Sequence, residues 1–182
     1  MPGLPFLPAD VAEPADLVAA VRARRGGALL HLDRMLLHSP AFAQGWNAFL
    51  REVRGGLALE PRLRELAVCA VALLNGAPYE LHHHAPELLA AGGTRAQLDA
   101  LVRAGGLAAP DAPFDARERV ALRLAAEMTR DVAVAETTLA EVRALLGDRE
   151  TVELVGVVAT YNMVSRFLVA LGIEPEQPAA AP

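Results

Sequence analysis

The sequence predicts an all-α fold, and three observations carry this prediction. Aromatic side chains make up only 4% of the 182 residues, and runs of alternating β-branched residues, which are typical of strands, are missing. Alanine, leucine, valine, arginine and glutamate dominate the composition. Several segments also begin with an N-cap residue that is followed three positions later by glutamate or glutamine, a pattern that marks helix starts.

The first sixty residues are expected to form three short helices that serve as packing elements. We place these helices at about 15–24, 27–37 and 40–51. Gly-Gly and Ser-Pro pairs separate them, and both kinds of pair interrupt helices.

A central helix is expected over residues 61–75. Pro61 suits its first turn, where the missing N–H would have no partner within the helix. The run LAVCAVALL that follows is apolar around its whole circumference, which is typical of a helix surrounded by protein. Asn75-Gly76 ends this helix, and Pro78 begins the next one, over about 78–91.

The C-terminal half is predicted to contain four further helices. Three of them begin at capping boxes, and the last is capped by Asp148 and ends at Gly172. We therefore expect one domain over 1–182, with packing helices over about 1–60, a core over 61–172 and a tail over 173–182. The capping boxes are Thr94 with Gln97, Asp115 with Glu118, and Thr138 with Glu141.

The composition excludes several classes of function. The 17 basic and 22 acidic side chains give a formal charge of −5, so there is no basic excess to bind nucleic acid or an anionic membrane. A hydrophobic content of 53% excludes a disordered chain, and the apolar run 66–79 is shorter than the roughly 20 residues that span a bilayer. The start of the chain shows no secretory signal. We therefore expect a soluble, cytoplasmic protein.

Three consecutive histidines near a carboxylate form the main candidate for chemistry. In the segment YELHHH, residues 79–84, helical spacing places Glu80 on the same side as His84 and His83 and turns His82 away. A carboxylate beside an imidazole raises the pKa of the imidazole, whereas partial burial lowers it. We therefore expect Glu80 to orient His84 in acid/base chemistry, with His83 as a further catalytic candidate.

A second carboxylate, Glu65, is the last charge before the central helix becomes entirely apolar. It begins a stripe of small residues, with Cys69, Ala72 and Gly76, that leaves room for a substrate or a partner helix. We expect Glu65 to complete a proton relay.

Polar residues also interrupt the last predicted helix, at Tyr161, Asn162 and Arg166. They suit a contact between helices or subunits, and Arg166 alternatively suits an anchor for a substrate carboxylate. Arg166 and Tyr79, which lies beside Glu80, are therefore the candidates for substrate binding.

These residues resemble the carboxymuconolactone decarboxylase and alkylhydroperoxidase D-like superfamily. The resemblance is strongest over residues 61–102, in RLRELAVCAVALLNGAPYELHHHAPELLAAGG and TRAQLDAL, and it extends to YNMVSRFLVALGIEPE. It implies a bundle of helices assembled into a homo-oligomer, as a dimer, trimer or hexamer. Redox members carry a glutamate and, twelve residues later, a CxxCxxxH motif whose thiols exchange protons through that glutamate and histidine.

The chain departs from this redox motif at both cysteines. Counted from Glu65, the thiols fall at Ala77 and Glu80 and the histidine at His84, and the single Cys69 matches neither thiol position. Peroxide reduction in this superfamily needs a thiolate and a resolving thiol. The resemblance therefore favours the thiol-less branch, in which some members are lyases that act on a carboxylated lactone. It implies acid/base chemistry on a small carboxylated or carbonyl substrate, without a cofactor.

Alternatives stay open at this point. The chain is alternatively an alkylhydroperoxidase-like or peroxiredoxin-like antioxidant protein, or a non-catalytic oligomeric binding protein in which the polar cluster joins subunits. The carboxylates and histidines also suit a metal ion. Because adjacent histidines of a helix rarely face one centre, no metal is expected.

Overall fold

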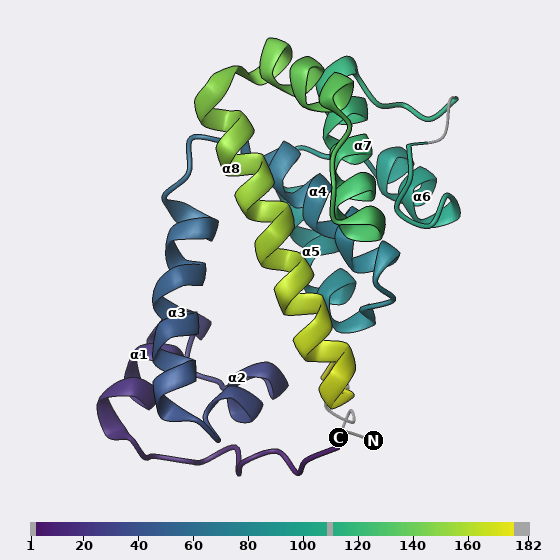
Figure 1. Cartoon of the computed structure of the whole chain (residues 1–182). Coiled ribbons are helices and arrows are strands. Elements are labelled where there is room, and N and C mark those ends of the chain that lie inside the picture. The colour runs from purple at the N-terminus through teal and green to yellow at the C-terminus, as the bar shows by residue number, and fades with distance from the viewer. Residues whose placement is uncertain (1–2, 109–110, 177–182) are drawn as a thin grey trace. The chain divides into compact units, whose positions relative to one another are not determined.

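The computed structural model of the protein describes residues 3–108 and 111–176. Over these residues it contains eight helices and no strand, which confirms the all-α class (Figure 1). The last six residues of the predicted tail lie outside the described residues. The helices are α1 (Ala15–Arg25), α2 (His31–Leu36), α3 (Pro40–Gly55), α4 (Pro61–Leu74), α5 (Pro78–Ala90), α6 (Arg95–Arg103), α7 (Ala116–Asp131) and α8 (Glu136–Leu171).

The chain divides into two compact units. Among the described residues, 3–56 and 170–176 form the first unit, and 57–169 form the second. These boundaries lie within a few residues of the limits expected at about 60 and 172. That the whole chain is one domain stays a prediction.

In the first unit, α3 packs against α1 and α2. Val21 of α1, Leu36 of α2 and Trp46 of α3 are among its buried side chains. Helix α2 is shorter than the range predicted from the sequence, because the chain leaves α1 through two glycines with positive φ. These are Gly26 at 75° and Gly27 at 110°, conformations that a helix does not continue.

In the second unit, α4 takes the central place predicted for it. Each residue from 66 to 72 is at most 1% exposed, and both α5 and α7 pack directly against this helix. Burial on all sides follows from the apolar circumference of the run. Because α4 is buried, Glu65, at the polar end of that run, also lies in the interior.

The loop after α6 approaches α4 closely at Gly106. Its φ is +91°, and a Cβ at this position would lie 2.7 Å from the carbonyl oxygen of Ala70 and 2.9 Å from Leu74 Cγ. The neighbouring Gly105 also has a positive φ, of +61°, but a Cβ there would meet nothing within 4 Å. Gly106 is therefore required both by its backbone conformation and by its contact with the central helix.

Two of the three predicted capping boxes are confirmed. The third is wrong, because α8 begins at Glu136 and Thr138 lies inside its first turn. The Thr138 hydroxyl donates to a carboxylate oxygen of Glu127 at 2.7 Å instead of capping a helix. The confirmed boxes are Thr94 with Gln97 before α6 and Asp115 with Glu118 before α7.

Helix α8 bends at Gly147, where the backbone is not helical, with φ 78° and ψ 173° (Figure 1). The two predicted C-terminal helices are therefore present as two segments of α8. Asp148 follows the bend at the position expected for a cap, and its carboxylate pairs with Arg143. The Thr151 hydroxyl donates to the Gly147 carbonyl oxygen at 2.6 Å, which fixes the start of the second segment.

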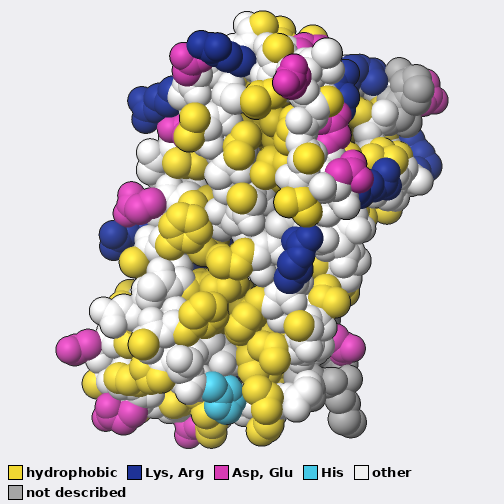
Figure 2. All heavy atoms as spheres, viewed as in Figure 1, with side chains coloured by type: hydrophobic (Ala, Val, Ile, Leu, Met, Phe, Trp, Pro, Cys, Tyr) yellow, Lys and Arg dark blue, Asp and Glu magenta, His cyan; other side chains and the backbone are white. Residues whose placement is uncertain are grey.

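Helix α8 is also long and apolar enough to cross a membrane, by length and composition alone. Half of its most apolar 18-residue stretch is buried inside the protein, and the core helix of a soluble protein passes the same test. Val152, Met163 and Val169 are exposed on this helix. Apolar side chains are visible at the surface of the molecule in Figure 2.

Candidate functional site

Glu65 and His84 meet in the interior of the second unit. Because α4 and α5 pack side by side, Glu65 Oε2 lies 2.6 Å from His84 Nδ1. Only 4% of Glu65 and 9% of His84 is exposed. The structure thus brings together two of the residues singled out in the sequence, in a buried and charge-assisted hydrogen bond.

The carboxylate of Glu65 is the ionised partner in this contact. Burial raises its pKa, but the hydrogen bond and charge of His84, together with the contact from Arg64, outweigh burial and hold the pKa below its usual value. An ionised carboxylate only accepts hydrogen bonds, so we assign the proton between the two groups to Nδ1 of His84. The other ring nitrogen, Nε2, is then a base when the ring is neutral and an acid when it is charged.

The Nε2 atom of His84 is the ring nitrogen that Glu65 does not occupy. It makes no hydrogen bond within the described residues, and the imidazole is more exposed than the glutamate behind it. Tyr161 of α8 packs edge-on against the ring, with the two centroids 4.9 Å apart.

Glu80 is hydrogen-bonded to α8. Its Oε1 accepts a hydrogen bond of 2.9 Å from Ser165 Oγ, and both side chains are buried. The carboxylate hydrogen-bonded to Nδ1 of His84, the ring that we expected Glu80 to orient, is that of Glu65.

Cys69 lies one turn after Glu65 in α4 and is fully buried. Burial, and then the negative charges of Glu65 and Glu80, raise the pKa of its thiol well above the usual value. Both carboxylates therefore act on one sulfur atom and keep it protonated. A buried and protonated thiol is a poor nucleophile.

His83 and Tyr79 pack against each other one turn apart on α5, with ring centroids separated by 4.5 Å. Tyr79 is buried and His83 is half-buried. The exposed His82 touches His83 edge-on, at a centroid distance of 5.1 Å. The structure therefore groups His83 with these two rings.

Arg166 is held by a polar network that joins three helices. One guanidinium nitrogen donates to the backbone oxygen of Asn162 at 2.9 Å and to its side-chain oxygen at 2.5 Å. That side-chain oxygen also accepts from Asn75 at the end of α4, and the Asn162 amide donates to Thr129 in α7. Arg166 itself is exposed, so the network presents an oriented cation at the surface.

The candidate residues are not arranged around a common ion. Over residues 3–108 and 111–176, no group of three or more His, Cys, Asp or Glu side chains is placed to hold a metal.

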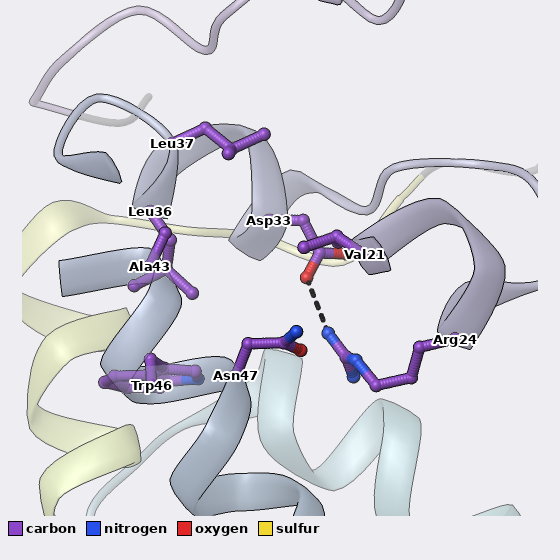
Figure 3. Close-up of a pocket in the computed structure, with 8 residues that line it drawn as sticks. All are labelled: Val21, Arg24, Asp33, Leu36, Leu37, Ala43, Trp46 and Asn47. Atoms are coloured by element: carbon purple, nitrogen blue, oxygen red, sulfur yellow. Dashed lines mark hydrogen bonds and ion pairs between the residues drawn. The ribbon is translucent and has the colours of Figure 1, made fainter. Parts of the chain in front are cut away.

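A small pocket lies in the first unit, between α1, α2 and α3, with room for one water-sized molecule (Figure 3). Inside it the buried Asp33 pairs with Arg24 at 3.2 Å. The side-chain amide of Asn47 points toward this pair (Figure 3). Since these residues connect three helices, we assign them a structural role.

Comparison with known sequences supports the family resemblance. The sequence model of the carboxymuconolactone decarboxylase family matches residues 40–127, a range that includes Glu65, Glu80 and His84. Over this range the protein is similar to the carboxymuconolactone decarboxylase family. The resemblance stated from the sequence is thereby confirmed. Among curated proteins, none matches the sequence.

Several solved structures have the same fold. An uncharacterised peroxidase-related protein from Silicibacter sp. TM1040 has a TM-score of 0.79 and 23% identity, covering 96% of this chain and 94% of its own. A second such protein, an alkylhydroperoxidase AhpD core from Ralstonia eutropha JMP134, has a TM-score of 0.77 and 19% identity, with coverages of 96% and 94%. The debrominase Bmp8, solved as a cysteine-to-alanine variant with 2,3,4-tribromopyrrole, has a TM-score of 0.80 and 14% identity, with coverages of 97% and 94%. These similarities establish the fold.

Proposed function

We propose that this protein is an enzyme that transfers protons to and from a small carboxylated or carbonyl substrate. The observation that carries the proposal is the buried hydrogen bond of 2.6 Å between Glu65 Oε2 and His84 Nδ1. It fixes the orientation of the ring and leaves Nε2 as the reacting nitrogen. In this proposal His84 is the general acid or base, and Glu65 positions it.

Decarboxylation is the reaction that the family name suggests, and the site suits its steps. The bond between the carboxylate carbon and its neighbour breaks, carbon dioxide leaves, and the electron pair passes into an adjacent carbonyl group. The charged ring of His84 then donates the Nε2 proton to the carbon that lost the carboxylate. No electrons are gained or lost overall, so the reaction needs neither a thiol nor a redox cofactor.

Peroxide reduction has less support. Two structural neighbours are peroxidase-related proteins, but Ala77 and Glu80 stand where the redox motif has its thiols. The remaining thiol, Cys69, is buried and its pKa is raised. We therefore propose proton transfer rather than thiol chemistry.

Turnover of a panel of small lactone carboxylates and oxo acids tests this proposal. We expect Glu65→Gln to lower kcat/KM about 10- to 100-fold, because a neutral amide no longer stabilises the imidazolium form of His84. We expect Cys69→Ala to keep kcat/KM within about twofold of wild type, since the thiol takes no part in the reaction.

Two results would contradict the proposal. One is equal turnover of every substrate by Glu65→Gln and by the wild type. The other is consumption of an alkyl hydroperoxide with a dithiol donor that disappears in Cys69→Ala.

Arg166 is proposed to bind the substrate carboxylate, because its guanidinium is exposed and oriented by Asn162. We expect Arg166→Gln to raise KM for a carboxylated substrate about tenfold, because the substrate loses one charge-assisted hydrogen bond. KM for the matching neutral amide should not change. Arg149→Gln is the control, since Arg149 is an exposed arginine of the same helix that pairs with Glu153. An equal rise in KM for the acid and the amide would show that Arg166 does not bind the carboxylate.

A further inference from the structure

We infer that Arg64 is a positioning residue, which holds the Glu65 carboxylate so that its second oxygen faces His84. Arg64 Nε donates to Glu65 Oε1 at 3.1 Å, and Glu65 Oε2 accepts from His84 Nδ1 at 2.6 Å. Each carboxylate oxygen is thus fixed by a different donor. The catalytic meaning of this inference rests on the proposed function, because Arg64 acts through Glu65 on the reacting imidazole.

The contact between Arg64 and Glu65 is not one that helix geometry supplies by itself. Consecutive residues of a helix point about 100° apart, so neighbours in sequence do not face each other. The long arginine side chain folds back to make the contact, and only 14% of it is exposed, against 6% for Glu65. Because solvent is largely excluded, the attraction exceeds that of an exposed ion pair.

Three helices supply the charged and titratable groups around this carboxylate. Among them, Arg64 alone carries a positive charge at every physiological pH, because the guanidinium does not lose its proton. The charge on His84, by contrast, comes and goes as the ring exchanges its proton. The groups are Arg64 and Cys69 of α4, His84 and Glu80 of α5, and Tyr161 of α8.

The permanent charge matters in the part of the cycle in which His84 is neutral. A buried carboxylate without a cation would then take up a proton, because burial disfavours its ionised form. With Arg64 in place Glu65 stays ionised, so Nδ1 keeps its proton and only Nε2 exchanges protons with the substrate. Arg64 thereby keeps the proton relay directed toward the substrate side of the ring.

A titration of the Glu65 side-chain carboxyl by NMR, in the full-length protein without substrate, tests this inference. We expect Arg64→Gln to raise the Glu65 midpoint by about one pH unit, the effect of removing an opposite charge in contact. Arg64→Lys keeps the charge and should shift the midpoint by less than half as much. Arg62→Gln is the matched control and should leave the midpoint unchanged, because Arg62 pairs with Glu60, Asp115 and Glu118.

The pH–rate profile provides the catalytic readout. The acidic limb, where protonation of Glu65 stops the reaction, should move to higher pH in Arg64→Gln by the same amount as the midpoint. The direction of this shift follows from the linkage between protonation and stability. The lowered pKa of Glu65 stabilises the folded, oriented state at pH values above the ordinary carboxyl pKa. This stabilisation is lost as the pH falls through the pKa of Glu65 in the folded protein. A higher folded-state value moves the loss upward.

An unchanged Glu65 midpoint in folded Arg64→Gln would overturn the inference, as would equal shifts in the Arg62 and Arg64 variants. A shifted midpoint with an unmoved acidic limb would also overturn it, since Arg64 would then affect Glu65 without affecting catalysis. Because the NMR titration needs no substrate, its failure is separate from failure of the proposed function, which is decided by the turnover of Glu65→Gln. Arg64→Met, which removes the charge but keeps the apolar part of the side chain, gives the same comparison if Arg64→Gln does not fold.

Discussion

Replacing His84 by glutamine is expected to lower kcat/KM about 10²- to 10⁴-fold, which is the range that a positioned general acid or base contributes. Glutamine is similar in length to histidine, but its amide does not gain or lose a proton near neutral pH. Glu65 would also lose the partner that now lies 2.6 Å away. The measurement is the initial rate with the best substrate of the panel at several pH values, where the pH dependence due to the ring should disappear.

Two controls separate chemistry from folding in this experiment. His82→Gln changes the exposed histidine of the same helix and should keep kcat/KM within about twofold of wild type. Free imidazole should restore part of the activity of His84→Ala, because the alanine leaves a cavity that the ring of imidazole can fill. If His84→Gln keeps more than about a tenth of the wild-type kcat/KM, the loss is smaller than the contribution of a general acid or base. That result would show that His84 does not transfer the proton.

The helices whose bounds the sequence predicts well are those that begin at a proline and end near a glycine. Pro61 and Pro78 begin α4 and α5, and the predicted ranges 61–75 and 78–91 differ from the observed helices by one residue each. Thr138 shows the opposite case. A capping pattern is a local signal, but the Glu127 carboxylate of α7 binds the threonine hydroxyl, and this tertiary contact is invisible in a ten-residue window.

The contacts of the candidate site are likewise predictable from the sequence only in part. The spacing from Glu65 to His84 is meaningful only through the superfamily motif, since nothing in the residues alone says that α4 and α5 pack with these two side chains opposed. Helical spacing predicts Glu80 as the partner of His84, because both lie on one face of one helix. The packing of α4 against α5 instead brings a carboxylate from another helix to the ring.

Other contacts of the site had little or no signal in the sequence. Ser165 lies four residues after Tyr161 and so shares its helix face, which was the available hint that it belongs to the same buried polar cluster. Arg64 offered no such hint, because adjacent residues of a helix are not expected to touch. Its contact depends on a side-chain conformation that only the folded structure specifies.

Substituting alanine for Gly106 is expected to destabilise the protein by about 3 kcal/mol. About 1 kcal/mol comes from placing a side chain at φ +91°, and about 2 kcal/mol from forcing a methyl group against the α4 backbone. The contact atom is the carbonyl oxygen of Ala70, in the middle of the central helix, which cannot move aside as a flexible side chain would. Urea-induced unfolding followed by circular dichroism gives the change in unfolding free energy directly.

Gly105→Ala is a matched control that isolates the contact from the backbone conformation. Gly105 also has a positive φ, but a Cβ there meets nothing within 4 Å, so the expected loss is only about 1 kcal/mol. Ala70 and Glu65 lie on the same helix, α4. Displacement of α4 by the added methyl group should therefore also lengthen the Glu65–His84 contact. We expect turnover to fall at temperatures where Gly106→Ala is still folded. Equal destabilisation by the two substitutions would mean that the loop is free to move away from α4, and that its close approach does not hold the central helix in place.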